Sequence, residues 1–255
     1  MRVQWAASSH PGIRRLTNED SYCTRPDLGL FVVADGMGGH VAGEIASRIV
    51  VQAIESYVAE TVDADASNTW PQPYDTTLGV DGNRLKGAFH LANQRLAKEV
   101  AGSQDLRGMA TTASALIVNG STAALAHVGD SRIYRWRDGA IERMTIDHSW
   151  VEDQVRAGLL SANEARQHPW RNVVTRALSG GEDPEIDLRT LELTAKDRLL
   201  LCSDGLSSVV PDARIAALLS AHADPAAACD VLVAEANDNG GPDNVTALVV
   251  HIDAA

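Results

Sequence analysis

Aspartates at the ends of apolar runs are the residues of this sequence best placed for chemistry. Asp35 follows LFVVA, Asp130 follows ALAHVG, Asp204 follows LLLCS, and Asp243 stands just before VTALVV. In an antiparallel sheet the end of one strand lies beside the start of its neighbour, so these side chains can meet at one rim. Each aspartate alone also suits a turn. Anions held together repel one another unless a cation neutralises them, and the repetition favours a cation site.

The donor types indicate which cation would bind. The sequence has no cluster of Cys and His, which excludes zinc-finger and iron–sulfur sites. Carboxylates, a backbone carbonyl and water suit Mg²⁺ or Mn²⁺. Two such ions about 3.5–4 Å apart lower the pKa of a shared water and stabilise an in-line displacement at phosphorus.

Phosphoryl oxygens also need a fixed cation, and arginine binds them through two parallel hydrogen bonds. Arg14 and Arg15 stand just before the acid pair Glu19-Asp20. By charge alone, both arginines are equally well explained as surface residues.

Residues 30–47, LFVVADGMGGHVAGEIAS, combine a strand that we expect to end at Asp35, a glycine-rich loop and a helix. Gly36 leaves the backbone free to approach a ligand. A P-loop needs Lys and Ser or Thr after its last glycine, but Glu44 and Ile45 stand there; Val41 occupies the third glycine position of the dinucleotide pattern. A loop led by a carboxylate suits a cation better than a bare phosphate.

Composition limits the class of protein. The chain has 255 residues, is 45% hydrophobic and carries a net charge of −12. The acidic balance argues against non-specific binding to nucleic acid or to an anionic membrane surface. An odd count of 3 cysteines indicates reduced thiols, and no apolar run reaches the ~20 residues of a membrane span. We therefore expect a cytoplasmic protein with no nucleic-acid partner and no membrane span.

Periodicity places these residues on elements. Amphipathic helices are expected in two pairs, at 44–58 and 84–100 and at 212–219 and 225–236. Short apolar runs separated by turn residues predict strands at 3–8, 22–24, 30–34, 112–118, 123–128, 132–136, 140–144, 188–193, 198–202 and 245–252. Strands come in blocks, which favours an α+β protein with two antiparallel sheets between the helix pairs. Residues 64–82 are interpreted as a surface loop and 147–185 as an excursion from the core.

Several motifs, taken in chain order, resemble those of the metal-dependent Ser/Thr protein phosphatases of type 2C (the PPM family) in their single-domain bacterial form. They are RLTNEDS, VADGMGGHVAGEIAS, GMATTASALIV, HVGDSRIY, HPWRNVVTRAL, LLLCSDGL and GGPDNVT, and together they span nearly the whole chain. The resemblance implies a four-layer α-β-β-α sandwich. It also implies one catalytic domain over residues 1–255, acting as a monomer, with a flap segment at about 148–185 beside the active site.

The same resemblance implies a set of metal ligands. Asp35 would bridge two ions, and the carbonyl of Gly36 would complete the second site. Asp204 and Asp243 would hold the first ion. Asp130, together with Asp204, matches a third-metal site of bacterial members.

The resemblance also implies roles for the residues at the matching positions of the other motifs. Arg15 would bind the substrate phosphate, and Asp20 would orient a metal-bound water with support from Glu19. Animal members have His directly after the Asp-Gly pair, where this chain has Met37. His40 is a candidate to protonate the leaving oxygen, and a structural role in the loop is the alternative.

The activity implied is hydrolysis of phosphoserine and phosphothreonine in proteins. A water or hydroxide that bridges two Mn²⁺ or Mg²⁺ ions would attack phosphorus without a phospho-enzyme. The partners implied are phosphorylated proteins in bacterial signal transduction, including a cognate Ser/Thr kinase and its substrates. The alternative is a catalytically inactive binding module on the same fold, against which every implied metal carboxylate is present.

Overall fold

The computed structural model of the protein describes residues 1–38 and 42–254. Its strands are β1 (Arg2–His10), β2 (Asp20–Arg25), β3 (Leu30–Met37), β4 (Ala110–Thr111), β5 (Ala113–Asn119), β6 (Thr122–Val128), β7 (Arg132–Arg137), β8 (Ala140–Arg143), β9 (Asp187–Glu192), β10 (Arg198–Cys202) and β11 (Val245–Asp253). They form two sheets, of order β1-β11-β10-β7-β8 and β2-β3-β5-β6-β9, with β4 beside β3. The strand pairs are antiparallel.

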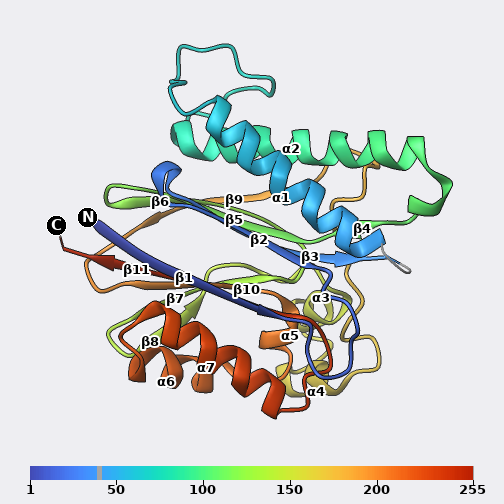
Figure 1. The fold of residues 1–255 in the computed structure, drawn as a ribbon, viewed down its shortest axis with the longest axis vertical. Coiled ribbons are helices and arrows are strands. Elements are labelled where there is room, and N and C mark those ends of the chain that lie inside the picture. The colour runs from blue at the N-terminus through green and yellow to red at the C-terminus, as the bar shows by residue number, and fades with distance from the viewer. Residues whose placement is uncertain (39–41, 255) are drawn as a thin grey trace.

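Helix pairs cover the outer faces of both sheets (Figure 1). Helices α1 (Ala42–Glu60) and α2 (Gly79–Gly102) lie on the second sheet, and α6 (Asp212–Ala221) and α7 (Pro225–Asp238) lie on the first. This arrangement confirms the predicted α-β-β-α sandwich. The shorter helices are α3 (Trp150–Arg156), α4 (Ala162–Gln167), α5 (Asp204–Ser207), and the 3₁₀ turns η1 (Pro26–Leu28) and η2 (Gln104–Leu106).

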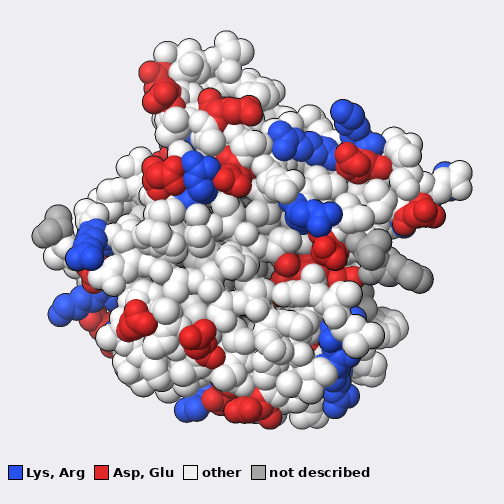
Figure 2. All heavy atoms as spheres, viewed as in Figure 1, with Lys and Arg blue, Asp and Glu red and all other residues white. Residues whose placement is uncertain are grey.

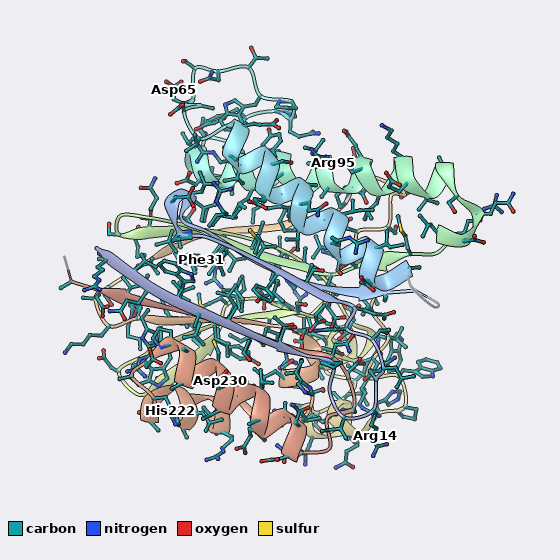
Figure 3. All side chains as sticks on the ribbon, in the orientation of Figure 1. Arg14, Phe31, Asp65, Arg95, His222 and Asp230 are labelled. Carbon is teal, nitrogen blue, oxygen red and sulfur yellow. The ribbon has the colours of Figure 1, made fainter. Side chains whose placement is uncertain are left out.

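Strand β3 shows why its sequence is apolar without interruption. Side chains alternate across a strand, so Leu30 and Val32 pack under α1 and α2, whereas Phe31 and Val33 point between the two sheets. Phe31 is labelled in Figure 3. Both faces of the strand are buried, and neither needs polar residues.

The end of β3 differs from the prediction. The strand continues to Met37 instead of ending at Asp35, because β4 pairs with its last residues in the register Gly36↔Thr111 and Met37↔Ala110. The strand predicted at 112–118 begins one residue later, as β5, and Thr112 separates it from β4, which was not predicted. Asp35 therefore lies within a paired strand, directly opposite Asp20 of β2. Its backbone is held by β2 on one side and by the amide of Thr112 on the other.

The chain between β8 and β9 leaves the sandwich and carries α3 and α4 near the end where the aspartates lie (Figure 1). On the face shown in Figure 2, Lys and Arg occur in small groups interspersed with Asp and Glu. Within residues 1–38 and 42–254, no helix is both long and apolar enough to cross a bilayer.

Candidate active site

The predicted carboxylates gather at one end of the sandwich, where the two sheets face each other. Asp20 and Asp35 pair across β2 and β3. Asp204 opens α5 directly after β10, and Asp243 stands just before β11 in the other sheet. Asp130 occupies the turn that follows β6. Each sheet thus contributes acids to a shared site.

The charges in this group act on one another. Burial, followed by the fields of Asp20, Asp204, Asp130 and Asp243, raises the pKa of Asp35 well above its usual range. Burial and the charge of Asp204 do the same to the pKa of Asp130. The pKa of Asp204 is raised to about 6, chiefly by burial and then by Asp243, while a hydrogen bond between the Asp204 and Asp35 carboxyl groups lowers it. Two carboxyl groups that share a hydrogen bond need a proton between them, and a cation can take the place of that proton.

The fit of this site to a metal ion rests on that pairing. Among residues 1–38 and 42–254, no three His, Cys, Asp or Glu side chains form a cage around one point. Mg²⁺ is nevertheless bound through one or two carboxylates, with water completing its shell. A group of neighbouring, buried or half-buried carboxylates offers oxygen donors and no nitrogen or sulfur donors. Such a donor set matches that requirement and does not match zinc. The residues therefore fit Mg²⁺ or Mn²⁺ as sites shared with water.

Arg15 reaches the edge of the acid group from the loop between β1 and β2. Its Nη2 donates to Asp243 Oδ2 at 2.8 Å, and its side chain is 52% exposed. The hydrogen bond and charge of Asp243 raise the pKa of the guanidinium. Arg14 is exposed on the same loop (Figure 3), and its side chain makes no hydrogen bond or ion pair to the acids of the described residues. Of these two arginines, Arg15 is therefore the one positioned to meet an anion that enters the site.

Asp20 is held by two hydroxyl groups that the sequence did not reveal. Ser203 Oγ and Thr246 Oγ1 each donate to Asp20 Oδ2 at 2.7 Å. Burial raises the pKa of Asp20 to about 7, against the effect of these two hydrogen bonds. Its other oxygen, Oδ1, is buried and has no hydrogen-bond partner among the described residues. One oxygen is thus fixed and the other is left to accept from a solvent molecule.

Asn244 was also missed, and it shapes the loop that carries Arg15. Its Nδ2 donates to the carbonyls of Pro11 at 2.9 Å and Thr17 at 2.8 Å, and its Oδ1 accepts from the amide of Glu19 at 2.7 Å. The residue is 4% exposed. The buried side chain of Asn244, the residue after Asp243, thereby holds both ends of the loop that carries Arg15. An Asn-Val-Thr sequence beside a strand gives no sign of contacts this distant in the chain.

The backbone around Asp35 is held by two threonines. Thr111 Oγ1 donates to the Asp35 carbonyl at 2.8 Å, and the Asp35 amide donates to Thr112 Oγ1 at 3.1 Å. At Gly36 a Cβ would lie 2.0 Å from the carbonyl oxygen of Gly43. Glycine is therefore required beside Asp35 because the start of α1 lies too close for a side chain. This reason is separate from the approach of a ligand.

Glu19 was predicted to support Asp20, and His40 was predicted to protonate the leaving oxygen. Glu19 lies beside the group, and burial raises its pKa while Arg15 lowers it. His40 lies outside the described residues. Two other histidines have partners outside the acid group. His127 is fully buried and hydrogen bonds with Ser114 Oγ at 2.9 Å, and the His168 ring stacks on Trp150 with ring centroids 4.8 Å apart.

A pocket of about 390 Å³ lies beside Asp130 and Asp204, under α3 and α4. Arg132 lines this pocket and forms a bidentate ion pair with Asp147, with Nη2–Oδ2 2.6 Å and Nε–Oδ1 2.9 Å. The Arg132 charge lowers the pKa of both Asp130 and Asp204. The pocket therefore joins the carboxylate group to the excursion between β8 and β9.

The arrangement matches known proteins over nearly the whole chain. Residues 13–236 match the family model described as Protein phosphatase 2C. The serine/threonine protein phosphatase PstP of Mycobacterium tuberculosis is 38% identical over 251 residues, which cover 98% of this chain and 45% of that protein. The serine/threonine phosphatase stp of Listeria monocytogenes is 33% identical, with 92% and 90% covered.

A solved structure extends the match to three dimensions. The crystal structure of the catalytic domain of PstP in complex with 2 manganese ions superposes with a TM-score of 0.81 at 36% identity, and 99% of each chain is covered. The chain thus spans less than half the length of the M. tuberculosis relative, and it matches nearly all of the PstP catalytic domain in this crystal structure.

Proposed function

The chain belongs to the protein phosphatase 2C family, and from that membership we propose that it is a metal-dependent protein serine/threonine phosphatase. The observation that carries the proposal is the group of buried and half-buried carboxylates at the junction of the two sheets, with Arg15 hydrogen bonded to its edge at 2.8 Å. An inactive binding module would not need to keep mutually repelling acids buried together, so that alternative has no support.

The proposed ligands are Asp35 and the Gly36 carbonyl, with Asp204 and Asp243 on the facing sheet. Asp130 and Asp204 would hold a third ion. When bound, Mn²⁺ or Mg²⁺ would lower the pKa of water and offset the negative charge that develops at phosphorus.

The chain's own groups perform the remaining tasks. Arg15, held toward the site by Asp243, would bind two phosphoryl oxygens and align the phosphate. The free Oδ1 of Asp20 would accept a hydrogen bond from the attacking water and orient it. Glu19 would support this geometry through the loop, and His40 remains our candidate for the acid that protonates the leaving serine or threonine oxygen.

The wider role is proposed on the same basis. Residues 1–255 would act as one catalytic domain, with residues 148–185, named here the flap segment, beside the active site. The substrates would be phosphorylated proteins of a bacterial signalling system, including a cognate Ser/Thr kinase and its targets. We propose a cytoplasmic monomer.

The test is hydrolysis of p-nitrophenyl phosphate and of a phosphothreonine peptide with EDTA, Mg²⁺ or Mn²⁺. We expect metal-dependent turnover in the wild type and a loss of at least about 10³-fold in Asp35→Asn and Asp204→Ala. Asp230→Ala, an exposed residue of α7 far from the group, is the matched control (Figure 3). Normal turnover in Asp35→Asn would refute the metal assignment, and no turnover by the wild type with any metal would refute the activity.

A further inference from the structure

The turn that carries Asp130 is held by one side chain from the start of the flap segment. The Gly129 amide donates to His148 Nδ1 at 3.0 Å, and the His148 amide donates to the Gly129 carbonyl at 2.7 Å. Gly129 has a φ of +113°, and a Cβ there would lie 2.4 Å from Thr112 Cβ. The backbone next to Asp130 is therefore confined on one side by Thr112 and fixed on the other by His148.

The hydrogen bond from Gly129 determines which nitrogen of His148 carries its proton. A ring nitrogen that accepts cannot be protonated, so in the neutral ring the proton lies on Nε2. Nε2 lies 3.2 Å from Asp187 Oδ2, to which it donates. Burial lowers the pKa of His148, which favours this neutral form. The two ring nitrogens thus contact two different parts of the chain.

Asp187 lies where the flap segment rejoins the sandwich, as the first residue of β9. Arg176, within the flap segment, approaches the same carboxylate with Nη1–Oδ1 3.6 Å and pairs with Glu185 with Nη2–Oε2 3.1 Å. The Thr175 amide donates to the His148 carbonyl at 2.8 Å. His148 therefore contacts the base of the flap segment at both its outgoing and its returning chain.

We propose that His148 is a positioning residue that couples the flap segment to the Asp130 turn. Its Nδ1 holds the turn and its Nε2 holds the returning chain through Asp187, so the carboxylate and the flap base keep a fixed relative position. The inference rests on the proposed function, because Asp130 matters through the ion assigned to it. A histidine that only packed against His127, whose ring lies 4.9 Å away, would show no difference between its two nitrogens.

Two substitutions separate the two contacts. In His148→Asn the amide oxygen takes the place of Nδ1 and still accepts from Gly129, but the side chain at 148 no longer reaches Asp187, whose carboxylate keeps, among the described residues, only its contact with Arg176. In His148→Gln the longer amide reaches Asp187, but no acceptor remains for Gly129. His222→Asn, at the end of α6 on the opposite side of the molecule, is the control for an unrelated histidine (Figure 3).

The measurements are hydrogen–deuterium exchange of residues 149–185, with and without Mn²⁺, and calorimetric Mn²⁺ titration. In metal-free protein we expect faster exchange of the flap segment in His148→Asn. In His148→Gln we expect a loss of roughly tenfold or more in the affinity of one Mn²⁺ site, the one assigned to Asp130, the size typical of residues that orient a metal ligand. In wild type, Mn²⁺ should slow flap exchange; in both variants that effect should disappear.

Equal flap exchange in wild type and both variants, or an equal Mn²⁺ effect in all three, would overturn the coupling. Asp187→Ala changes a residue at the surface and should reproduce His148→Asn, so the test survives if a His148 variant does not fold. If wild type binds no Mn²⁺, the proposed function fails, and the metal-free exchange comparison still decides whether His148 joins the two parts.

Discussion

At the scale of single residues, the site depends on neutral side chains that hold charged ones. Ser203 and Thr246 fix one oxygen of Asp20, Asn244 fixes the loop of Arg15, and His148 fixes the turn of Asp130. Charged groups would be poor supports here, because another charge would shift the pKa values of the acids still further. Neutral donors set geometry and leave the electrostatics to the carboxylates and the ions proposed to bind them.

Thr246→Val should lower turnover by about tenfold at pH 7, because Asp20 loses one of two hydrogen bonds that favour its charged form. Losing that donor raises the pKa of Asp20 further, so the activity profile should move to higher pH, with KM nearly unchanged. The pH dependence of kcat checks this. Thr122→Val, whose hydroxyl only bonds the Asn119 carbonyl, is the control. An unaltered pH profile in Thr246→Val would contradict the role given to Asp20.

His127 should make the fold less stable in mild acid. Burial lowers its pKa to about 4 in the folded protein, against 6.5 for the free side chain. Between these values the unfolded chain binds more protons, so the stabilisation is fully present above about pH 6.5 and is lost as pH falls toward 4, up to roughly 3 kcal/mol.

The measurement is the urea unfolding free energy of wild type and His127→Asn between pH 7 and pH 5. The buried acids have raised pKa values and act in the opposite direction, so only the difference between the two proteins isolates His127. Parallel curves for the two proteins would refute the assignment.

At the scale of elements, loops with unrelated sequences are ordered by buried polar side chains. The loop of residues 61–78 projects from the ends of α1 and α2, with Asp65 near its tip (Figures 1 and 3). Arg84 of α2 is 7% exposed and donates to the carbonyls of Thr61 at 2.9 Å and Val62 at 3.1 Å. It also pairs with Asp81. The predicted surface loop at 64–82 is correct up to residue 78, whereas residues 79–82 form the first turn of α2. The hydrogen bonds from Arg84 order the start of the loop.

Arg84→Met should loosen this loop without changing catalysis. The substitution leaves the carbonyls under the loop without their donors, and we expect a loss of about 2 kcal/mol in unfolding free energy and faster proteolysis within residues 61–78. Turnover should stay within about twofold, since the loop lies away from the aspartates. Lys98→Met, exposed on the same helix, is the control. A large loss of turnover would show that this loop takes part in the reaction.

At the scale of the whole molecule, the site lies where two sheets meet, and each sheet contributes ligands. Asp35 belongs to the second sheet, whereas Asp204 and Asp243 flank strands of the first. Apolar side chains such as Phe31 and Leu248 pack between the sheets and hold the two sets of acids at a constant separation. Without ions, that packing must overcome the repulsion of the acids.

Mn²⁺ should therefore raise the melting temperature of the protein, and EDTA should reverse the change. Binding at a concentration of 100 times Kd stabilises by about 2.7 kcal/mol, which corresponds to roughly 5–10 °C for a protein of this size. Asp35→Asn should remove most of the shift, and in EDTA it should melt above wild type because one repelling charge is gone. Asp230→Asn should behave as wild type throughout. A full Mn²⁺ shift in Asp35→Asn would place the ions elsewhere.

Much of this protein could be predicted from local patterns. Apolar runs with period two or 3.6, divided by Asn-Gly and Asp-Gly turns, indicated the strands, the helix pairs and the sandwich, because burial of one face leaves a repeating signal in the chain. Aspartates next to those runs indicated a carboxylate site with oxygen ligands. The end of β3 was missed because β4 extends it, and a two-residue strand has no period of its own.

Only the tertiary structure decided which residues support that site. Asn244 contacts carbonyls more than 220 positions away in the chain, and His148 joins a turn to the return of the flap segment. Such hydrogen bonds depend on where the fold brings the backbone, and a polar side chain near a strand has the same local sequence whether or not it reaches a partner. Residue type determines which chemistry the acids can perform; the distance between the two sheets determines whether they perform it together.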